Sequence, residues 1–247
     1  LGAGGPERAG DCEALARKLE ATVRLVSALF GVEERVPSEF TFYLAPGAAR
    51  DAFLERHPAY DAERRAACAK TPGAGVPGGT NTALFESEPR RRDDCAVRNA
   101  LWQLLRLDFG IDMTHGWAFE GLGLYLSREL VGSRLTWSVL ARPDAEALRA
   151  GLLAPESNWM SEGLKLLTTP GAPELGLDKP VKELAIADLV VGYVFSAYLL
   201  EGWPDRAAAF LEKTGAGKQT AETSRAVLGM SMEELKERLV RWLGERR

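Results

Sequence analysis

The segment from Leu189 to Leu200 constrains the fold more than any other part of the chain, because its 12 residues include no charged side chain. A helix built from it is apolar on most sides and must be surrounded by other elements of the protein. A helix needs about 20 predominantly apolar residues to span a bilayer. The segment is too short for that, so the sequence predicts a buried helix over residues 183–201 and no membrane span.

The second half of the chain shows a helical pattern throughout. From residue 133 onward, apolar residues recur at spacings of three and four, which is typical of amphipathic helices. Ser231 and Glu234 form the sequence pattern of a capping box at the start of the last helix. The predicted helices cover residues 143–153, 157–168, 183–201, 204–214, 219–228 and 231–245.

The first half of the chain mixes strand and helix signals. Glu39–Leu44 and Asn81–Phe85 are rich in residues that favour strands, and Thr71–Gly79 has the composition of a loop. Residues 1–10 are rich in Gly and Ala and predict disorder. The remaining segments predict helices over residues 11–30, 48–56, 94–107 and 117–131. The expected fold class is α/β in the broad sense (α+β), with an α/β subdomain over 1–132 and a helical subdomain over 133–247.

Charge and composition exclude some classes of partner. The formal net charge is −4, which gives no electrostatic basis for binding nucleic acid. Apolar residues make up 46% of the chain and charged residues 27%, as in ordinary globular proteins. The basic run Arg90–Arg92 is followed by Asp93 and Asp94, so we expect a solvated loop and then a helix with acidic residues in its first turn.

The three cysteines, Cys12, Cys68 and Cys95, are too few for a disulfide framework. Two arrangements remain open. One is a single bridge between Cys68 and Cys95 with Cys12 left over, and the other is three buried thiols.

Two predicted helices carry residues at spacings that suggest a site. Trp117–Tyr125 reads Trp-Ala-Phe-Glu-Gly-Leu-Gly-Leu-Tyr, with Glu120 at its centre. On the preceding helix, Asn99 and Gln103 are four residues apart and therefore lie on one face. Ala100 follows Asn99 directly.

The stretch around Glu120 resembles the W-x-x-E-G-x-A-x-Y helix of the gluzincin, or peptidase-MA-like, zinc metallopeptidases. In that family this Glu is the third zinc ligand, and H-E-x-x-H on the preceding helix supplies two His ligands and the general base. Aligned on apolar positions, Asn99, Ala100 and Gln103 stand where H-E-x-x-H has His, Glu and His. The resemblance covers roughly residues 35–245. It implies a zincin-like domain with a small mixed sheet and a pair of active-site-type helices.

The resemblance also implies that the metal chemistry has been lost. Zinc sites use Cys, His, Asp and Glu, so two carboxamides are poor replacements, and Ala100 has no group that can accept a proton. We therefore expect no zinc, no other cofactor and no catalytic residues. The expected function is that of a pseudoenzyme, a catalytically inactive peptidase-like domain that serves as a binding or structural module. The alternative is an active hydrolase or metallopeptidase that uses a site these motifs do not mark.

A buried carboxylate without its cation must be hydrogen-bonded or neutralised. We expect Asn99 or Gln103 to donate to Glu120, either directly or through one water, with Arg98 or His115 as an alternative partner. Five residues are candidates for lining the former substrate cleft: Asn99, Gln103, His115, Glu120 and Tyr193.

A peptide or protein is the expected partner in the former substrate cleft. In gluzincins an edge strand above the metal pairs with an extended substrate, and the predicted strand over Asn81–Phe85 is the expected counterpart. The alternative for this segment is an ordinary edge strand with no ligand. The resemblance also favours an exported or periplasmic bacterial protein.

Overall fold

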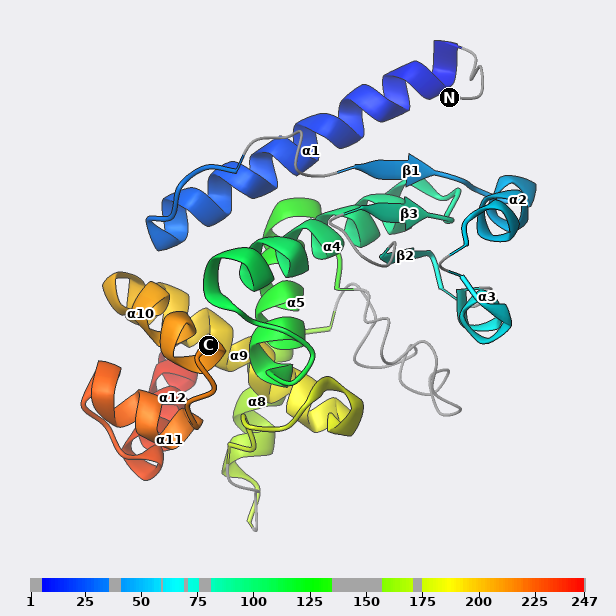
Figure 1. The fold of residues 1–247 in the computed structure, drawn as a ribbon. Coiled ribbons are helices and arrows are strands. Elements are labelled where there is room, and N and C mark those ends of the chain that lie inside the picture. The colour runs from blue at the N-terminus through cyan, green and yellow to red at the C-terminus, as the bar shows by residue number, and fades with distance from the viewer. Residues whose placement is uncertain are drawn as a thin grey trace.

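A small sheet lies against two long helices in the first half of the chain, and the helices of the second half gather at the other end of the molecule (Figure 1). The computed structural model describes residues 6–35, 41–58, 60–68, 71–75, 81–134, 157–170 and 175–246. The fold is α+β: it is mostly helical, with a three-stranded mixed sheet. The predicted broad fold class is confirmed.

The sheet consists of β1 (Phe42–Leu44), β2 (Gly73–Gly75) and β3 (Thr82–Leu84), in the order β1-β3-β2. β1 runs parallel to β3, with Tyr43 opposite Ala83, and β2 runs antiparallel to it, with Ala74 opposite Ala83. The prediction of an edge strand over Asn81–Phe85 was therefore wrong, because β3 is the central strand. Thr82, Ala83 and Leu84 are fully buried, as expected for a strand covered on both faces.

The prediction of a loop over 71–79 was also wrong in part, because it contains β2. Gly and Ala have weak intrinsic strand preference, so composition concealed this strand. Gly73 is required by close packing: a Cβ there would lie 2.5 Å from the Ala83 carbonyl oxygen and 2.9 Å from Cys95 Sγ. Residues 76–80 lie outside the described part of the chain.

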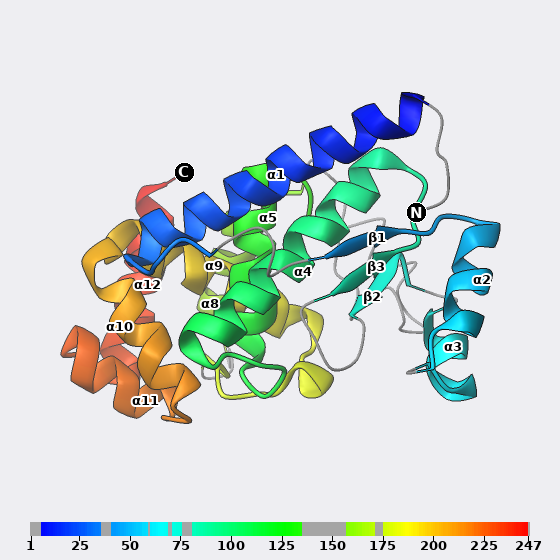
Figure 2. The same ribbon diagram turned by 45° about the horizontal axis from the view of Figure 1, so that its top comes forward.

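α1 (Pro6–Phe30) and α4 (Pro89–Phe109) lie side by side along the sheet, as Figures 1 and 2 both show. Helix α1 begins before residue 10, so the prediction of disorder fails for residues 6–10. Leu84 belongs to the small apolar cluster between the sheet and these two helices, whereas the adjacent Ala83 belongs to a different cluster. That second cluster packs beneath α2 (Ala48–Arg56) and α3 (Ala62–Cys68).

Helix α4 starts five residues earlier than predicted. Its N-cap is Glu88, whose side chain accepts hydrogen bonds from the backbone N–H groups of Arg90 and Arg91, and Pro89 is its first residue. Asp93 and Asp94 therefore lie in the second turn and not in the first. The predicted loop over Arg90–Arg92 is therefore the first turn of α4, which the Glu88 carboxylate caps.

The C-terminal helices match the sequence closely. The structure contains α8 (Trp159–Thr168), η3 (Val181–Glu183), α9 (Ile186–Gly202), α10 (Pro204–Gly215), α11 (Thr220–Thr223), the π-helical segment η4 (Ser224–Leu228) and α12 (Met232–Glu245). All residues from Leu189 to Leu200 are buried, as predicted. The capping box is confirmed, since Ser231 accepts from the Glu234 N–H and Glu234 accepts from the Ser231 N–H. The predicted helix 143–153 lies outside the described residues.

No helix in the described ranges has both the length and the apolar character needed to cross a membrane.

The Glu120 motif forms the π-helical segment η2 (Trp117–Leu122), which continues directly into α5 (Gly123–Val131). This helix crosses α9 where Gly121 meets Gly192, and Gly121 has almost no space for a side chain. A Cβ on Gly121 would lie 2.4 Å from the carbonyl carbon of Gly192. The close approach places η2 between α9 and α4, at the centre of the molecule.

Candidate functional site

The centre of the candidate site is a buried ion pair between α4 and η2. Arg98 is fully buried, and its Nη2 donates to Oε2 of Glu120, which is only 2% exposed. Charge-assisted hydrogen bonds of this kind are stronger than those from neutral donors. The pair therefore neutralises the Glu120 carboxylate and fastens the two helices together.

Trp102 lies one turn after Arg98 on the same face of α4. Its Nε1 donates to the Phe119 carbonyl oxygen at 2.8 Å, and its ring stacks on Phe119 with centroids 4.6 Å apart. The Arg98 guanidinium carbon lies 5.1 Å from the centre of the Trp102 ring. Arg98 and Trp102 are thus the two residues, four apart, that α4 directs at η2.

Asn99 and Gln103 are held by other groups. Asn99 is buried, and its Nδ2 donates to the Cys95 carbonyl oxygen at 2.9 Å and contacts Cys95 Sγ at 3.5 Å. The Gln103 Oε1 accepts from Arg106 Nη2 at 2.8 Å near the surface.

The prediction that Asn99 or Gln103 donates directly to Glu120 was therefore wrong, and the alternative partner, Arg98, is confirmed. The reason is the rotation of α4 about its axis. The face that meets η2 carries Arg98 and Trp102, whereas the prediction placed Asn99 and Gln103 there. Ala100 is buried and lines a pocket beside α1.

His115 lies in the turn before η2, where it is partnered by Asp112. The Asp112 backbone N–H donates to His115 Nδ1 at 3.2 Å, and the Asp112 carboxylate lies 3.1 Å from the same nitrogen. Hydrogen bonding from the Thr114 hydroxyl is the main cause that lowers the pKa of Asp112, despite slight burial. These contacts form a local turn and do not join His115 to Glu120.

Tyr193 is buried among aromatic rings and Arg134. Its ring centroid lies 5.2 Å from that of Trp159 and 5.6 Å from that of Tyr125, in edge-on arrangements. The Arg134 guanidinium carbon lies 5.6 Å from the Tyr193 ring centre, and burial raises the pKa of Tyr193. These contacts give Tyr193 a packing role between α5, α8 and α9.

The described thiols are free. Cys68 and Cys95 are buried and unbridged, whereas Cys12 is exposed. The predicted alternative of a Cys68–Cys95 bridge was therefore wrong, and the alternative of three buried thiols holds for two of them. Burial is the main cause that raises the pKa of Cys95 well above its usual range. Within the described ranges, no three His, Cys, Asp or Glu side chains gather in a group that could hold a metal ion.

Sequence reasoning missed Trp102 and gave Arg98 only a secondary role. A signal for both was available, because residues 98 and 102 have the same four-residue spacing as residues 99 and 103. Apolar periodicity fixes which side of a helix faces the core, but it leaves the rotation uncertain by about one residue.

No family model matches the chain, and no curated protein or solved structure is significantly similar to it.

Proposed function

We propose that this chain is a non-catalytic peptidase-like domain in which the Arg98–Glu120 ion pair replaces a zinc ion. The observation that carries the proposal is the partner of Glu120. The resemblance gives this carboxylate the role of third zinc ligand, and here a buried guanidinium donates to it instead. A cation is thus still present beside Glu120, but it is a side chain.

The residues on the facing turn of α4 do not fit a zinc site. If the H-E-x-x-H pattern is placed on the face that meets η2, its positions hold Arg98, Asn99 and Trp102. Arginine remains protonated, and the indole N–H is a donor only, so neither can ligate a metal. Asn99 stands where the general base would be, and its amide donates to the Cys95 carbonyl. The set supplies neither imidazole ligand nor a proton acceptor.

The arrangement of elements supports a zincin-like scaffold. A mixed sheet packs on α4, the helix containing Glu120 follows, and helices form the rest of the chain. The resemblance implies that a former substrate cleft would lie by α4 and η2, and a peptide or protein is the proposed class of partner. The proposed function is binding or structural support.

The experiment that tests the proposal measures zinc and proteolysis in the purified full chain. After dialysis, elemental analysis is expected to find far less than one zinc per chain, because Arg98 occupies the carboxylate. Cleavage of casein and of peptide libraries is expected to show no chelator-sensitive component. About one zinc per chain that disappears in Glu120→Ala would contradict the proposal.

A further inference from the structure

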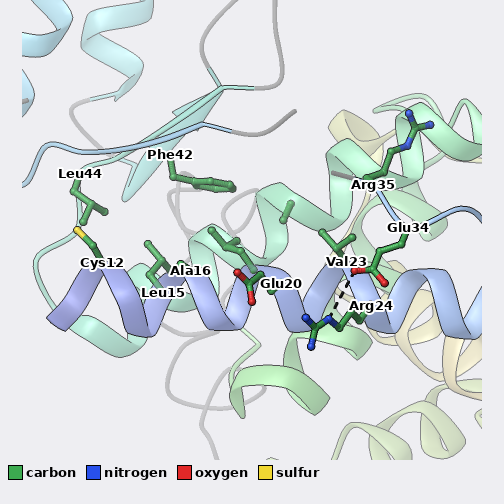
Figure 3. A pocket seen from close by; sticks show the side chains of 12 residues that line it. Cys12, Leu15, Ala16, Glu20, Val23, Arg24, Glu34, Arg35, Phe42 and Leu44 are labelled. Atoms are coloured by element: carbon green, nitrogen blue, oxygen red, sulfur yellow. Dashed lines mark ion pairs between the residues drawn. The ribbon is translucent and has the colours of Figure 1, made fainter. Parts of the chain in front are cut away.

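A pocket of about 380 Å³ lies between α1, β1 and α4 (Figure 3), and Glu120 is not among the residues that line it. Leu15, Leu19 and Val23 line it from α1, and Phe42 and Leu44 line it from β1. The lining is predominantly apolar, with charged side chains at one end. The volume is at the lower end of the range of ligand pockets and is large enough to admit an aliphatic or aromatic side chain.

The pocket lies beside an edge of the sheet that pairs with no other strand among the described residues. β1 is an outer strand in the order β1-β3-β2. The Thr82 N–H donates to the Thr41 carbonyl, and the Ala45 N–H donates to the Leu84 carbonyl. Along a strand in a parallel pair, residues whose backbone N–H and C=O groups bond the neighbouring strand alternate with residues whose backbone groups point to the opposite edge. The backbone groups of Phe42 and Leu44 therefore face away from β3.

A strand added to this edge would direct side chains into the pocket. Residues opposite one another on neighbouring strands point to the same face of a sheet. The side chains of Phe42 and Leu44 point into the pocket (Figure 3). Side chains of an added strand that stand opposite them would enter the same space, while its backbone pairs with β1.

The charges around the pocket leave one carboxylate available. Arg24 pairs with Glu34 at 3.7 Å, and Arg35 donates to Asp108 at 2.9 Å. Glu20 points toward the pocket in Figure 3, and within the described residues no ion pair or side-chain hydrogen bond engages it. A bound segment with a cationic side chain would complement this carboxylate.

We propose that β1 and the pocket beside α1 bind an extended peptide segment of the pattern apolar-x-basic. The segment adds to the outer edge of β1, its apolar side chain fills the pocket, and its Lys or Arg pairs with Glu20. The two side chains are separated by one residue because alternate residues of a strand share a face. The inference does not depend on the Arg98–Glu120 pair or on the loss of zinc.

The test uses a fluorescent, end-capped peptide in which Leu and Lys stand two apart in a background of Thr, and measures its binding to the full chain. Replacing Leu by Thr in the peptide is expected to weaken binding roughly tenfold or more. Replacing Lys by Glu is expected to weaken it a few-fold, as an exposed ion pair allows.

Backbone methylation tests strand addition directly. Only one edge of the peptide pairs with β1, so N-methylation of alternate residues along that edge is expected to abolish binding. N-methylation along the other edge is expected to leave it. Equal binding by both methylated peptides would contradict strand addition.

Two variants of the protein test the pocket and the charge. Ala16→Phe places a ring in the pocket from an exposed position on α1, and it is expected to weaken binding roughly tenfold or more. Glu20→Lys is expected to reverse the preference, so that the Glu peptide binds better than the Lys peptide. Glu13→Lys makes the same charge change at an exposed position of α1 that does not line the pocket. Identical peptide preferences in Glu20→Lys and Glu13→Lys would overturn the proposal, even if Ala16→Phe failed to fold.

Discussion

At the scale of single residues, the buried carboxylate of Glu120 needs a cationic or hydrogen-bonding partner inside the protein. A carboxylate that is 2% exposed must be neutralised or fully hydrogen-bonded. The Arg98 guanidinium meets that requirement, and stacking of Trp102 on Phe119 packs beside the pair. Both partners are buried, so removing one of them leaves an uncompensated charge in the core.

A double-mutant cycle on Arg98→Met and Glu120→Leu is expected to show strong coupling. Each single change should destabilise the protein by roughly 3–5 kcal/mol, because it leaves one buried charge unpaired. The double variant should lose less than the sum by about 2 kcal/mol or more. Urea unfolding followed by circular dichroism measures these free energies.

Asn99→Ala is the matched control for this cycle. Its amide donates to a carbonyl that also accepts from the α-helical backbone, so the cost should be below about 1.5 kcal/mol. Additive effects of the Arg98 and Glu120 changes would show that the pair does not hold the helices together.

At the scale of elements, the position of η2 depends on its contact with α9. The π-helical segment brings Gly121 against Gly192, so close that a Cβ on Gly121 would lie 2.4 Å from the Gly192 carbonyl carbon. Single π turns inside helices are frequent at functional sites. Here the π turn spans Trp117–Leu122 and therefore contains Glu120.

Gly121→Ala is expected to destabilise the protein by roughly 1–3 kcal/mol, since the added methyl group meets backbone that cannot move aside easily. Gly244→Ala in α12 is the control, because its Cβ would enter open space. That change should be neutral or slightly stabilising. Thermal unfolding of both variants measures the difference, and equal melting temperatures would contradict the close crossing of η2 and α9.

The N-terminus of α4 provides a pH-dependent contribution. Backbone hydrogen bonds from Arg90 and Arg91 are the main causes that lower the pKa of Glu88. Because the folded pKa lies below the unfolded value of about 4.3, the stabilisation is present above that value and is lost as the pH falls through the folded pKa.

Glu88→Gln should therefore lower stability at pH 7 by about a few tenths of a kcal/mol, a small effect because the group is exposed. The difference from wild type should vanish near pH 3. Glu13→Gln, in the middle of α1, is the control. A difference that stays constant from pH 7 to pH 3 would show that the carboxylate charge does not act as a cap.

At the scale of the whole molecule, one apolar core joins both halves of the chain. The same cluster contains residues from α1, α4, α5, α9 and α12, and α9 lies at its centre. The predicted boundary at residue 132 therefore separates segments that share a core.

The sequence predicted the helices best, because apolar periodicity and capping residues are local signals. The ends of α2, the burial of Leu189–Leu200 and the Ser231 capping box all follow from such signals. It predicted the sheet order poorly, since β2 consists of Gly-Ala-Gly and owes its place to packing on β3 and Cys95.

The candidate site was predicted in part. The pairing of α4 with the Glu120 segment followed from the motif, and Arg98 was among the expected partners. The sequence did not determine the rotation of α4, because residues 98 and 102 have the same spacing as residues 99 and 103 and only tertiary contacts decide which pair faces Glu120.

Zinc binding by a variant that introduces H-E-x-x-H on the face of α4 that meets η2 tests most directly the proposal that Arg98 stands in for a zinc ion. The triple variant Arg98→His, Asn99→Glu, Trp102→His is expected to bind about one zinc per chain in elemental analysis and calorimetry, and adding Glu120→Gln should abolish that binding. The control triple variant Asn99→His, Ala100→Glu, Gln103→His should bind none. Zinc binding by the control, with none by the first variant while circular dichroism shows both to be folded, would contradict the account.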